Sequence, residues 1–101
     1  PGQVAYATAK AAIKGLTRAL AVENAPYNVR VNCIAPGAVE SPRTEANIAA
    51  GLVSREELEG RTPTGKLTTP EQVAECVLWL CQVENMTGQI ITLDGGWSIQ
   101  G

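Results

Sequence analysis

The sequence predicts an α/β fold with a parallel sheet, in the order helix, strand, loop, helix, strand. An alanine-rich stretch without proline, residues 4–23, has the composition of a helix. Two short runs rich in β-branched residues, 29–35 and 89–93, have the composition of strands, and a second helical stretch, 69–83, lies between them. A strand, a crossover helix and another strand indicate a parallel pair with a right-handed crossover.

The first helix is expected over Val4–Glu23. An apolar stripe at helical spacing predicts its core face, made of Ala9, Ile13, Leu16 and Leu20. Small residues form a second stripe, made of Ala7, Ala11 and Gly15. This second stripe would let another helix approach closely.

Tyr6 and Lys10 are four residues apart in this helix, so the sequence places both side chains on one face. A positive charge close to a phenol favours its deprotonated form. Proton transfer is most efficient when the donor titrates near the working pH. The two residues are therefore a candidate acid/base pair for a carbonyl or an alcohol. The spacing is also common in an exposed tyrosine beside a solvated lysine.

A proline and two asparagines after the helix predict a stop and a turn. The next strand is expected over Val29–Ala35, with one face made of Val29, Val31 and Cys33. Pro36-Gly37 ends it, at the edge where an open α/β sheet presents its backbone to ligands. Gly37 can adopt a conformation that other residues avoid, and it leaves room for a ligand to approach closely. An ordinary turn is the alternative for a Pro-Gly pair.

Charged residues accumulate in the long excursion between the two strands, Ala38–Lys66. Ser41-Pro42 predicts a short helix through about Ala50, with Ser41 as the N-cap. Ser54-Arg55-Glu56-Glu57 is a capping box for a second short helix that ends at Gly60. Long insertions of this kind are usually lids or binding loops. An ordinary surface loop is the alternative.

Thr69-Pro70-Glu71-Gln72 marks the start of the second long helix, which should run to about Val83. Its predicted core side is made of Val73, Val77, Leu80 and Cys81, with Trp79 nearby. A turn leads into the strand Gln89–Leu93. Asp94-Gly95-Gly96 follows as a loop, and a short tail completes the chain.

Composition and charge argue against several classes of function. The net charge of −2 and the absence of Lys/Arg clusters make nucleic acid an unexpected partner. No apolar run approaches the ~18 residues of a membrane helix, so no membrane association is expected. The chain has no histidine and three cysteines, Cys33, Cys76 and Cys81, without a C-x-x-C pattern, so we expect no metal site. Buried free thiols in a reducing compartment, and hence a cytoplasmic protein, are expected.

The chain begins at Pro1-Gly2-Gln3, without an initiator Met and directly before a strong helix. Two strands and two long helices make a marginal core. We therefore expect the 101 residues to be one piece of a single domain of a longer protein.

Three motifs together resemble the C-terminal part of a short-chain dehydrogenase/reductase (SDR), and the resemblance covers essentially the whole chain. In order, they are Tyr6-x-x-x-Lys10, Asn32-x-x-x-Pro36-Gly37 and Asp94-Gly95-Gly96. The resemblance implies that residues 1–101 are the C-terminal portion of a Rossmann-like doubly wound parallel sheet. It also implies that the parent protein interconverts a carbonyl and an alcohol by hydride transfer with NAD or NADP.

The resemblance further implies roles for individual residues. Tyr6 would be the general acid/base, and Lys10 would bond the nicotinamide ribose hydroxyls. A second group would lie along the nicotinamide, with the Val39 backbone meeting its carboxamide: Pro36, Gly37 and Val39. Ser41 stands where the family usually has a cofactor-contacting Thr, a departure that keeps the hydroxyl.

The family's Gly-rich phosphate loop, cofactor-discriminating position and catalytic Ser and Asn precede the tyrosine, and only five residues precede Tyr6 here. The chain alone is therefore expected neither to bind a dinucleotide nor to turn over. A 3-oxoacyl-carrier-protein reductase and a sugar, polyol or cyclic-alcohol dehydrogenase both stay open as the parent. The family's usual assemblies predict a homodimer or homotetramer through the first helix and the last strand. The alternative is a non-catalytic truncated fragment that is stable only with a partner chain.

Overall fold

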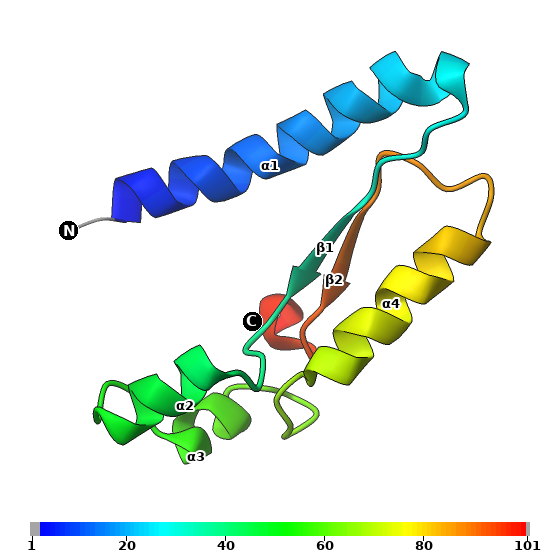
Figure 1. The fold of residues 1–101 in the computed structure, drawn as a ribbon. Coiled ribbons are helices and arrows are strands. Elements are labelled where there is room, and N and C mark those ends of the chain that lie inside the picture. Colours follow the sequence, from blue (N-terminus) through cyan, green and yellow to red (C-terminus); the bar gives the residue numbers. More distant parts are fainter. Residues whose placement is uncertain (1–2, 101) are drawn as a thin grey trace. The chain divides into compact units, whose positions relative to one another are not determined.

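The computed structural model describes residues 3–100, and its elements follow the predicted order (Figure 1). Two long helices, α1 (Gln3–Asn24) and α4 (Pro70–Gln82), accompany two strands, β1 (Cys33–Pro36) and β2 (Ile90–Leu93). The strands pair side by side in a parallel two-stranded sheet, so the predicted α/β class is confirmed. The short helices are α2 (Pro42–Ala49), α3 (Arg55–Gly60) and the 3₁₀ turns η1 (Ala25–Tyr27) and η2 (Trp97–Ile99). No helix within residues 3–100 is long and apolar enough to cross a membrane.

The chain forms two compact units, and each contains part of both strands. The first consists of the chain as far as Cys33 together with Leu80–Ile91. The second consists of Ile34–Trp79 together with the residues from Thr92 onward. Each unit thus joins segments that are far apart in the sequence.

Arg30 holds the first unit together. Its guanidinium donates to the carbonyl oxygens of Leu80 at 2.9 Å, Cys81 at 3.1 Å and Met86 at 3.0 Å. Carbonyls in the last turn of a helix have no partner within that helix. Arg30 therefore caps the end of α4 and ties it to the following turn.

The strand β1 starts four residues later than predicted, at Cys33 instead of Val29, and ends at Pro36. The hydrogen bonds of Val31, within the predicted strand, go to the turn before β2. The Val31 N–H donates to Thr87 Oγ1 at 3.1 Å, and the Val31 carbonyl accepts from the Gly88 N–H at 2.7 Å. The strand is short because side-chain and turn groups occupy the backbone partners that a longer ladder would need.

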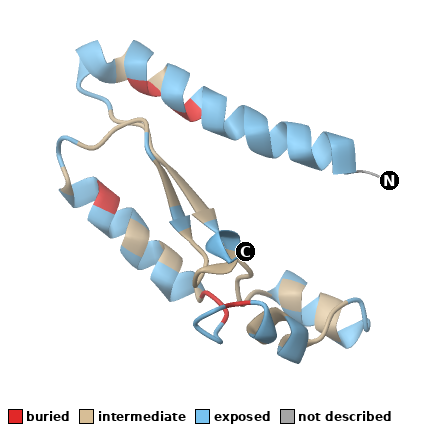
Figure 2. Ribbon diagram, turned by 180° about the vertical axis from the view of Figure 1, so that it is seen from behind, coloured by how far each residue is buried: buried red, intermediate tan, exposed pale blue. Residues whose placement is uncertain are grey.

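The helix α1 agrees with the prediction to within one residue at each end, but its predicted core face is wrong. Its buried residues are Thr17 and Ala21, whereas Ile13 and Leu16 are 43% and 57% exposed (Figure 2). A Cβ placed on Gly88 would lie 3.4 Å from the Ala21 Cβ. Burial on α1 therefore follows contact with this turn, which the helical periodicity of α1 cannot indicate.

The three predicted helix caps of the second unit are confirmed. The Ser41 hydroxyl accepts the Thr44 N–H at 3.2 Å, and the Ser54 hydroxyl accepts the Glu57 N–H at 3.0 Å. At α4 the box closes in both directions, with Gln72 N–H to Thr69 Oγ1 at 3.2 Å and Thr69 N–H to Gln72 Oε1 at 3.0 Å. Capping depends on residues three positions apart, so the sequence alone reveals it.

The predicted core side of α4 is confirmed only at Leu80, which is buried. Val77 and Trp79 are each 45% exposed. Among the cysteines, Cys33 and Cys76 are half-buried and Cys81 is exposed, so the expectation of a buried thiol is wrong for Cys81. Leu80 lies in the last turn of α4, where the Arg30 guanidinium donates to its carbonyl oxygen.

Candidate functional site

Tyr6 and Lys10 lie one helical turn apart on α1. The Lys10 Nζ stands over the Tyr6 ring, 5.4 Å from the ring centroid, so the predicted shared face is confirmed. This distance is within the range of a cation–π interaction. Tyr6 is 63% exposed. The helix therefore presents a phenol and an ammonium together on an accessible surface.

Gly37 follows β1, and the structure gives a different reason for a glycine at this position from the one predicted. Its backbone is ordinary, because it is not among the glycines with positive φ. A Cβ on Gly37 would lie 2.8 Å from the Asp94 Cβ and 3.0 Å from the Asp94 Cα. The expectation of a special backbone conformation is therefore wrong, whereas room for a ligand beside Gly37 stays a prediction. Gly37 lacks a side chain because Asp94 fills that space.

Val39 pairs with Thr68 in an isolated parallel β-bridge. The hydrogen bonds of this bridge are made by the residues on either side of Val39 and not by Val39 itself. The Thr68 N–H donates to the Ala38 carbonyl at 2.9 Å, and the Glu40 N–H donates to the Thr68 carbonyl at 2.8 Å. The Val39 carbonyl accepts the Thr44 hydroxyl at 2.6 Å. The Val39 N–H has no hydrogen-bond partner within residues 3–100. An unpaired backbone donor of this kind can bind a ligand oxygen.

The Ser41 hydroxyl is already engaged at the start of α2. Besides accepting the Thr44 N–H, it donates to Thr44 Oγ1 at 3.2 Å. Thr44 thus links Ser41 to the Val39 carbonyl, a role that was not predicted from the sequence. The Ser-x-x-Thr spacing at the helix cap is the sequence pattern that could have indicated it.

The six candidate residues fall into two groups. Tyr6 and Lys10 belong to the first unit, and the second unit holds Pro36, Gly37, Val39 and Ser41. The members of each group are close in the sequence: one helical turn separates the first two, and the other four lie within positions 36–41.

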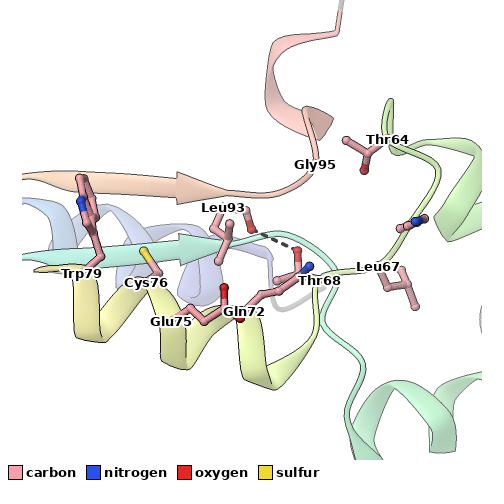
Figure 3. Close-up of a pocket in the computed structure, with 10 residues that line it drawn as sticks. Thr64, Leu67, Thr68, Gln72, Glu75, Cys76, Trp79, Leu93 and Gly95 are labelled. Carbon is pink, nitrogen blue, oxygen red and sulfur yellow. Dashed lines mark hydrogen bonds between the residues drawn. The ribbon is translucent and has the colours of Figure 1, made fainter.

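An open cavity of about 540 Å³ lies elsewhere in the second unit (Figure 3). The first part of α4, the end of β2 and residues 64–68 surround it. Its lining is Thr64, Lys66, Leu67, Thr68, Gln72, Glu75, Cys76, Trp79, Leu93 and Gly95. None of the six candidate residues lines the cavity. Over residues 3–100, no group of three or more Cys, Asp or Glu side chains is placed to hold a metal ion.

Comparisons with known proteins agree on one family. A family model described as enoyl-(acyl carrier protein) reductase matches residues 1–98. The chain is 43% identical over 98 residues to the 3-oxoacyl-(acyl-carrier-protein) reductase FabG of Thermotoga maritima, covering 95% of this chain and 39% of that protein. It is 43% identical over 96 residues to carbonyl reductase family member 4 of Danio rerio, covering 94% and 38%. The solved structure of ElxO with NADP bound matches with a TM-score of 0.85 at 30% identity, covering 99% of this chain and 41% of that one.

The chain therefore belongs to the short-chain dehydrogenase/reductase family, and its fold is the C-terminal portion of a Rossmann-like sheet. It spans about two fifths of the length of these curated relatives. The resemblance seen in the sequence is confirmed. The matched family description names an enoyl reductase, whereas the relatives are named 3-oxoacyl and carbonyl reductases. The names thus agree on reduction and differ on the substrate.

Proposed function

We propose that this chain is part of an NAD- or NADP-dependent oxidoreductase that interconverts a carbonyl and an alcohol by hydride transfer. The observation that carries the proposal is the Lys10 ammonium over the Tyr6 ring on an exposed helix face. The relatives named as reductases and the NADP-bound neighbour support it. Because two of these names refer to acyl-carrier-protein substrates, we favour a 3-oxoacyl thioester over a sugar, polyol or cyclic alcohol.

The second group of residues fits the nicotinamide end of such a cofactor. The unpaired Val39 N–H could donate to a carboxamide oxygen, while Pro36 and Gly37 shape the adjoining backbone. Ser41 would contribute its hydroxyl, which Thr44 now holds in place. These residues would bind and orient the ring without taking part in proton transfer.

The Asp94-Gly95-Gly96 turn does not fit the pyrophosphate end of such a cofactor. A pyrophosphate is usually held where a Gly-rich turn opens a helix. The Asp94-Gly95-Gly96 turn opens only the three-residue η2. Its Gly96 and Ser98 N–H groups already donate to the Asp94 carboxylate, each at 2.9 Å. In the proposed function, residues other than this turn would hold the pyrophosphate.

The nicotinamide would supply or accept the hydride when bound. In reduction the Tyr6 hydroxyl would give its proton to the carbonyl oxygen, and in oxidation the phenolate would take it back. The Lys10 ammonium would bond the ribose hydroxyls. The phenol and ammonium are close enough to act together because one helical turn separates them.

Replacing Tyr6 by phenylalanine in the complete natural protein tests the proposal. We expect Tyr6→Phe to lower NADH or NADPH oxidation with ketones and 3-oxoacyl thioesters by about 10²-fold or more, the scale of general acid/base catalysis. Cofactor affinity, followed by fluorescence titration, should change little. The matched control is Tyr27→Phe, the other tyrosine of the chain, which is 77% exposed. Undiminished turnover by Tyr6→Phe would exclude the proton-transfer role.

A second candidate is a non-catalytic chain that is stable only with a partner. The small core favours it: within residues 3–100 the buried hydrophobic residues are Ala21, Leu67 and Leu80. The intact mass of the natural protein separates the two candidates. A mass two to three times that of this chain supports the oxidoreductase, for which we propose a cytoplasmic homodimer or homotetramer. A mass equal to that of the chain supports the fragment and would make Tyr6 and Lys10 relics.

A further inference from the structure

We infer that the Asp94-Gly95-Gly96 turn is a positioning element that fastens both ends of the excursion, Ala38–Lys66. The effect of this turn on substrate binding rests on the proposed function, whereas the contacts between the turn and the excursion do not.

The entry of the excursion is fastened at Gly37. The Gly37 N–H donates to the Leu93 carbonyl, directly before the turn, at 3.0 Å. Asp94 lies so close that a Cβ on Gly37 would stand 2.8 Å from the Asp94 Cβ. The Thr68 hydroxyl adds a bond to the same Leu93 carbonyl at 3.3 Å, drawn as a dashed line in Figure 3.

The exit of the excursion is fastened at Gly95. Its carbonyl accepts the Thr64 N–H at 3.1 Å. A Cβ on Gly95 would lie 2.6 Å from both Thr62 Cγ2 and Thr64 Oγ1, closer than real Cβ contacts occur. Figure 3 shows Gly95 across from Thr64. At the next position a Cβ on Gly96 would meet Pro63 Cγ at 3.1 Å.

Hydrogen bonds within the turn also stabilise it. The Asp94 carboxylate accepts the N–H groups of Gly96 and Ser98, each at 2.9 Å. Gly95 and Gly96 have φ of +63° and +93°, which favour glycine over residues with a side chain. In the tail, the Gln100 amide donates to the Arg61 carbonyl, which adds another connection to the exit of the excursion.

Both ends of the excursion therefore depend on one rigid turn, and a shift of that turn would displace α2 and α3 together. Asp94, Gly95 and Gly96 lie outside the candidate catalytic pair. Their effect should appear as weaker substrate binding, with little change in the chemical step.

The test compares two glycines in the complete protein. Gly95→Ala introduces a side chain at φ +63° in the packed turn. The matched control, Gly51→Ala, introduces one at φ +75° within the excursion, where a Cβ meets nothing within 4 Å. Both substitutions place alanine at a similar positive φ, so their backbone strain is similar. A difference between the two variants therefore measures the effect of the close contact between position 95 and the excursion.

We expect Gly95→Ala to accelerate hydrogen exchange at residues 62 and 64 and to raise the KM for the carbonyl substrate about tenfold, with kcat nearly unchanged. Gly51→Ala should change neither the exchange at residues 62 and 64 nor the KM. If Gly95→Ala does not fold, Asp94→Asn is the milder variant and should change both readouts in the same direction.

Equal hydrogen exchange at residues 62 and 64 in Gly95→Ala and Gly51→Ala would overturn the proposed role of the turn in holding the excursion. A fall in kcat at unchanged KM would overturn the positioning role. If the wild-type protein reduces no carbonyl, the proposed function fails, and the exchange comparison still decides whether the turn fastens the excursion.

Discussion

At the scale of residues, Asp94 makes a close packing contact with one segment and hydrogen bonds within another. It fills the space that a Gly37 side chain would need, and its carboxylate folds the turn that follows β2. The Ser98 side chain, then the Ser98 N–H and the Gly96 N–H, donate hydrogen bonds that lower the pKa of Asp94 from its ordinary 3.8. These bonds favour the charged carboxylate, so folding and ionisation at Asp94 are coupled.

This coupling predicts a pH-dependent effect of Asp94→Asn on stability. A carboxyl whose pKa is lowered by folding contributes stability above its unfolded value and loses it as the pH falls through its folded value. We therefore expect the difference in thermal midpoint between wild type and Asp94→Asn to be largest above about pH 5 and to shrink below the ordinary Asp pKa. Thermal unfolding of the complete protein across this range measures it, with Glu84→Gln as an exposed-carboxylate control. A pH-independent difference would contradict the coupling.

At the scale of elements, the Arg55 side chain forms ion pairs that connect separate parts of the excursion. The Arg55 guanidinium lies 3.2 Å from Glu40, 2.8 Å from Glu45 and 3.6 Å from Glu59, which follow β1 or belong to α2 and α3. The hydrogen bond to Glu40 is the main cause that raises the pKa of Arg55, so the residue stays charged throughout the working range. The pairs are solvent-exposed, so salt should weaken them.

Arg55→Met is expected to loosen α2 and α3 without unfolding the protein. The apolar stem is retained, while the charge that joins the three carboxylates is lost. Hydrogen exchange over residues 42–60 should become faster in low salt, and the difference from wild type should narrow in high salt. Arg43→Met on α2 is the control, since Arg43 makes no ion pair in the described part of the chain. Equal exchange in the two variants would rule out the role of Arg55.

At the scale of the whole molecule, long-range hydrogen bonds join segments that the sequence separates. Arg30 reaches carbonyls 50 to 56 positions away and connects the start of the sheet to the end of α4. Asn32 adds to this connection, because its amide donates to the Met86 carbonyl at 3.0 Å and its oxygen accepts the Gln89 N–H at 3.1 Å.

We expect Arg30→Met to lower the free energy of unfolding by about 2 kcal/mol, the scale of a lost charged hydrogen bond that leaves carbonyls without a partner. Urea unfolding of the complete protein measures the change. Arg18→Met, an exposed position on α1, should be nearly neutral. Equal unfolding midpoints for the two variants would show that Arg30 does not hold the first unit together.

The sequence by itself determined the order of the elements, the three caps at Ser41, Ser54 and Thr69, the shared face of Tyr6 and Lys10, and the family. Each of these depends on residues within about four positions of one another or on motifs that keep their order and spacing. Only the tertiary structure decided which face of α1 is buried, that β1 begins at Cys33, and that Gly37 makes room for Asp94. These outcomes depend on contacts and hydrogen bonds between distant segments, because a residue's burial is set by the part of the chain that packs against it.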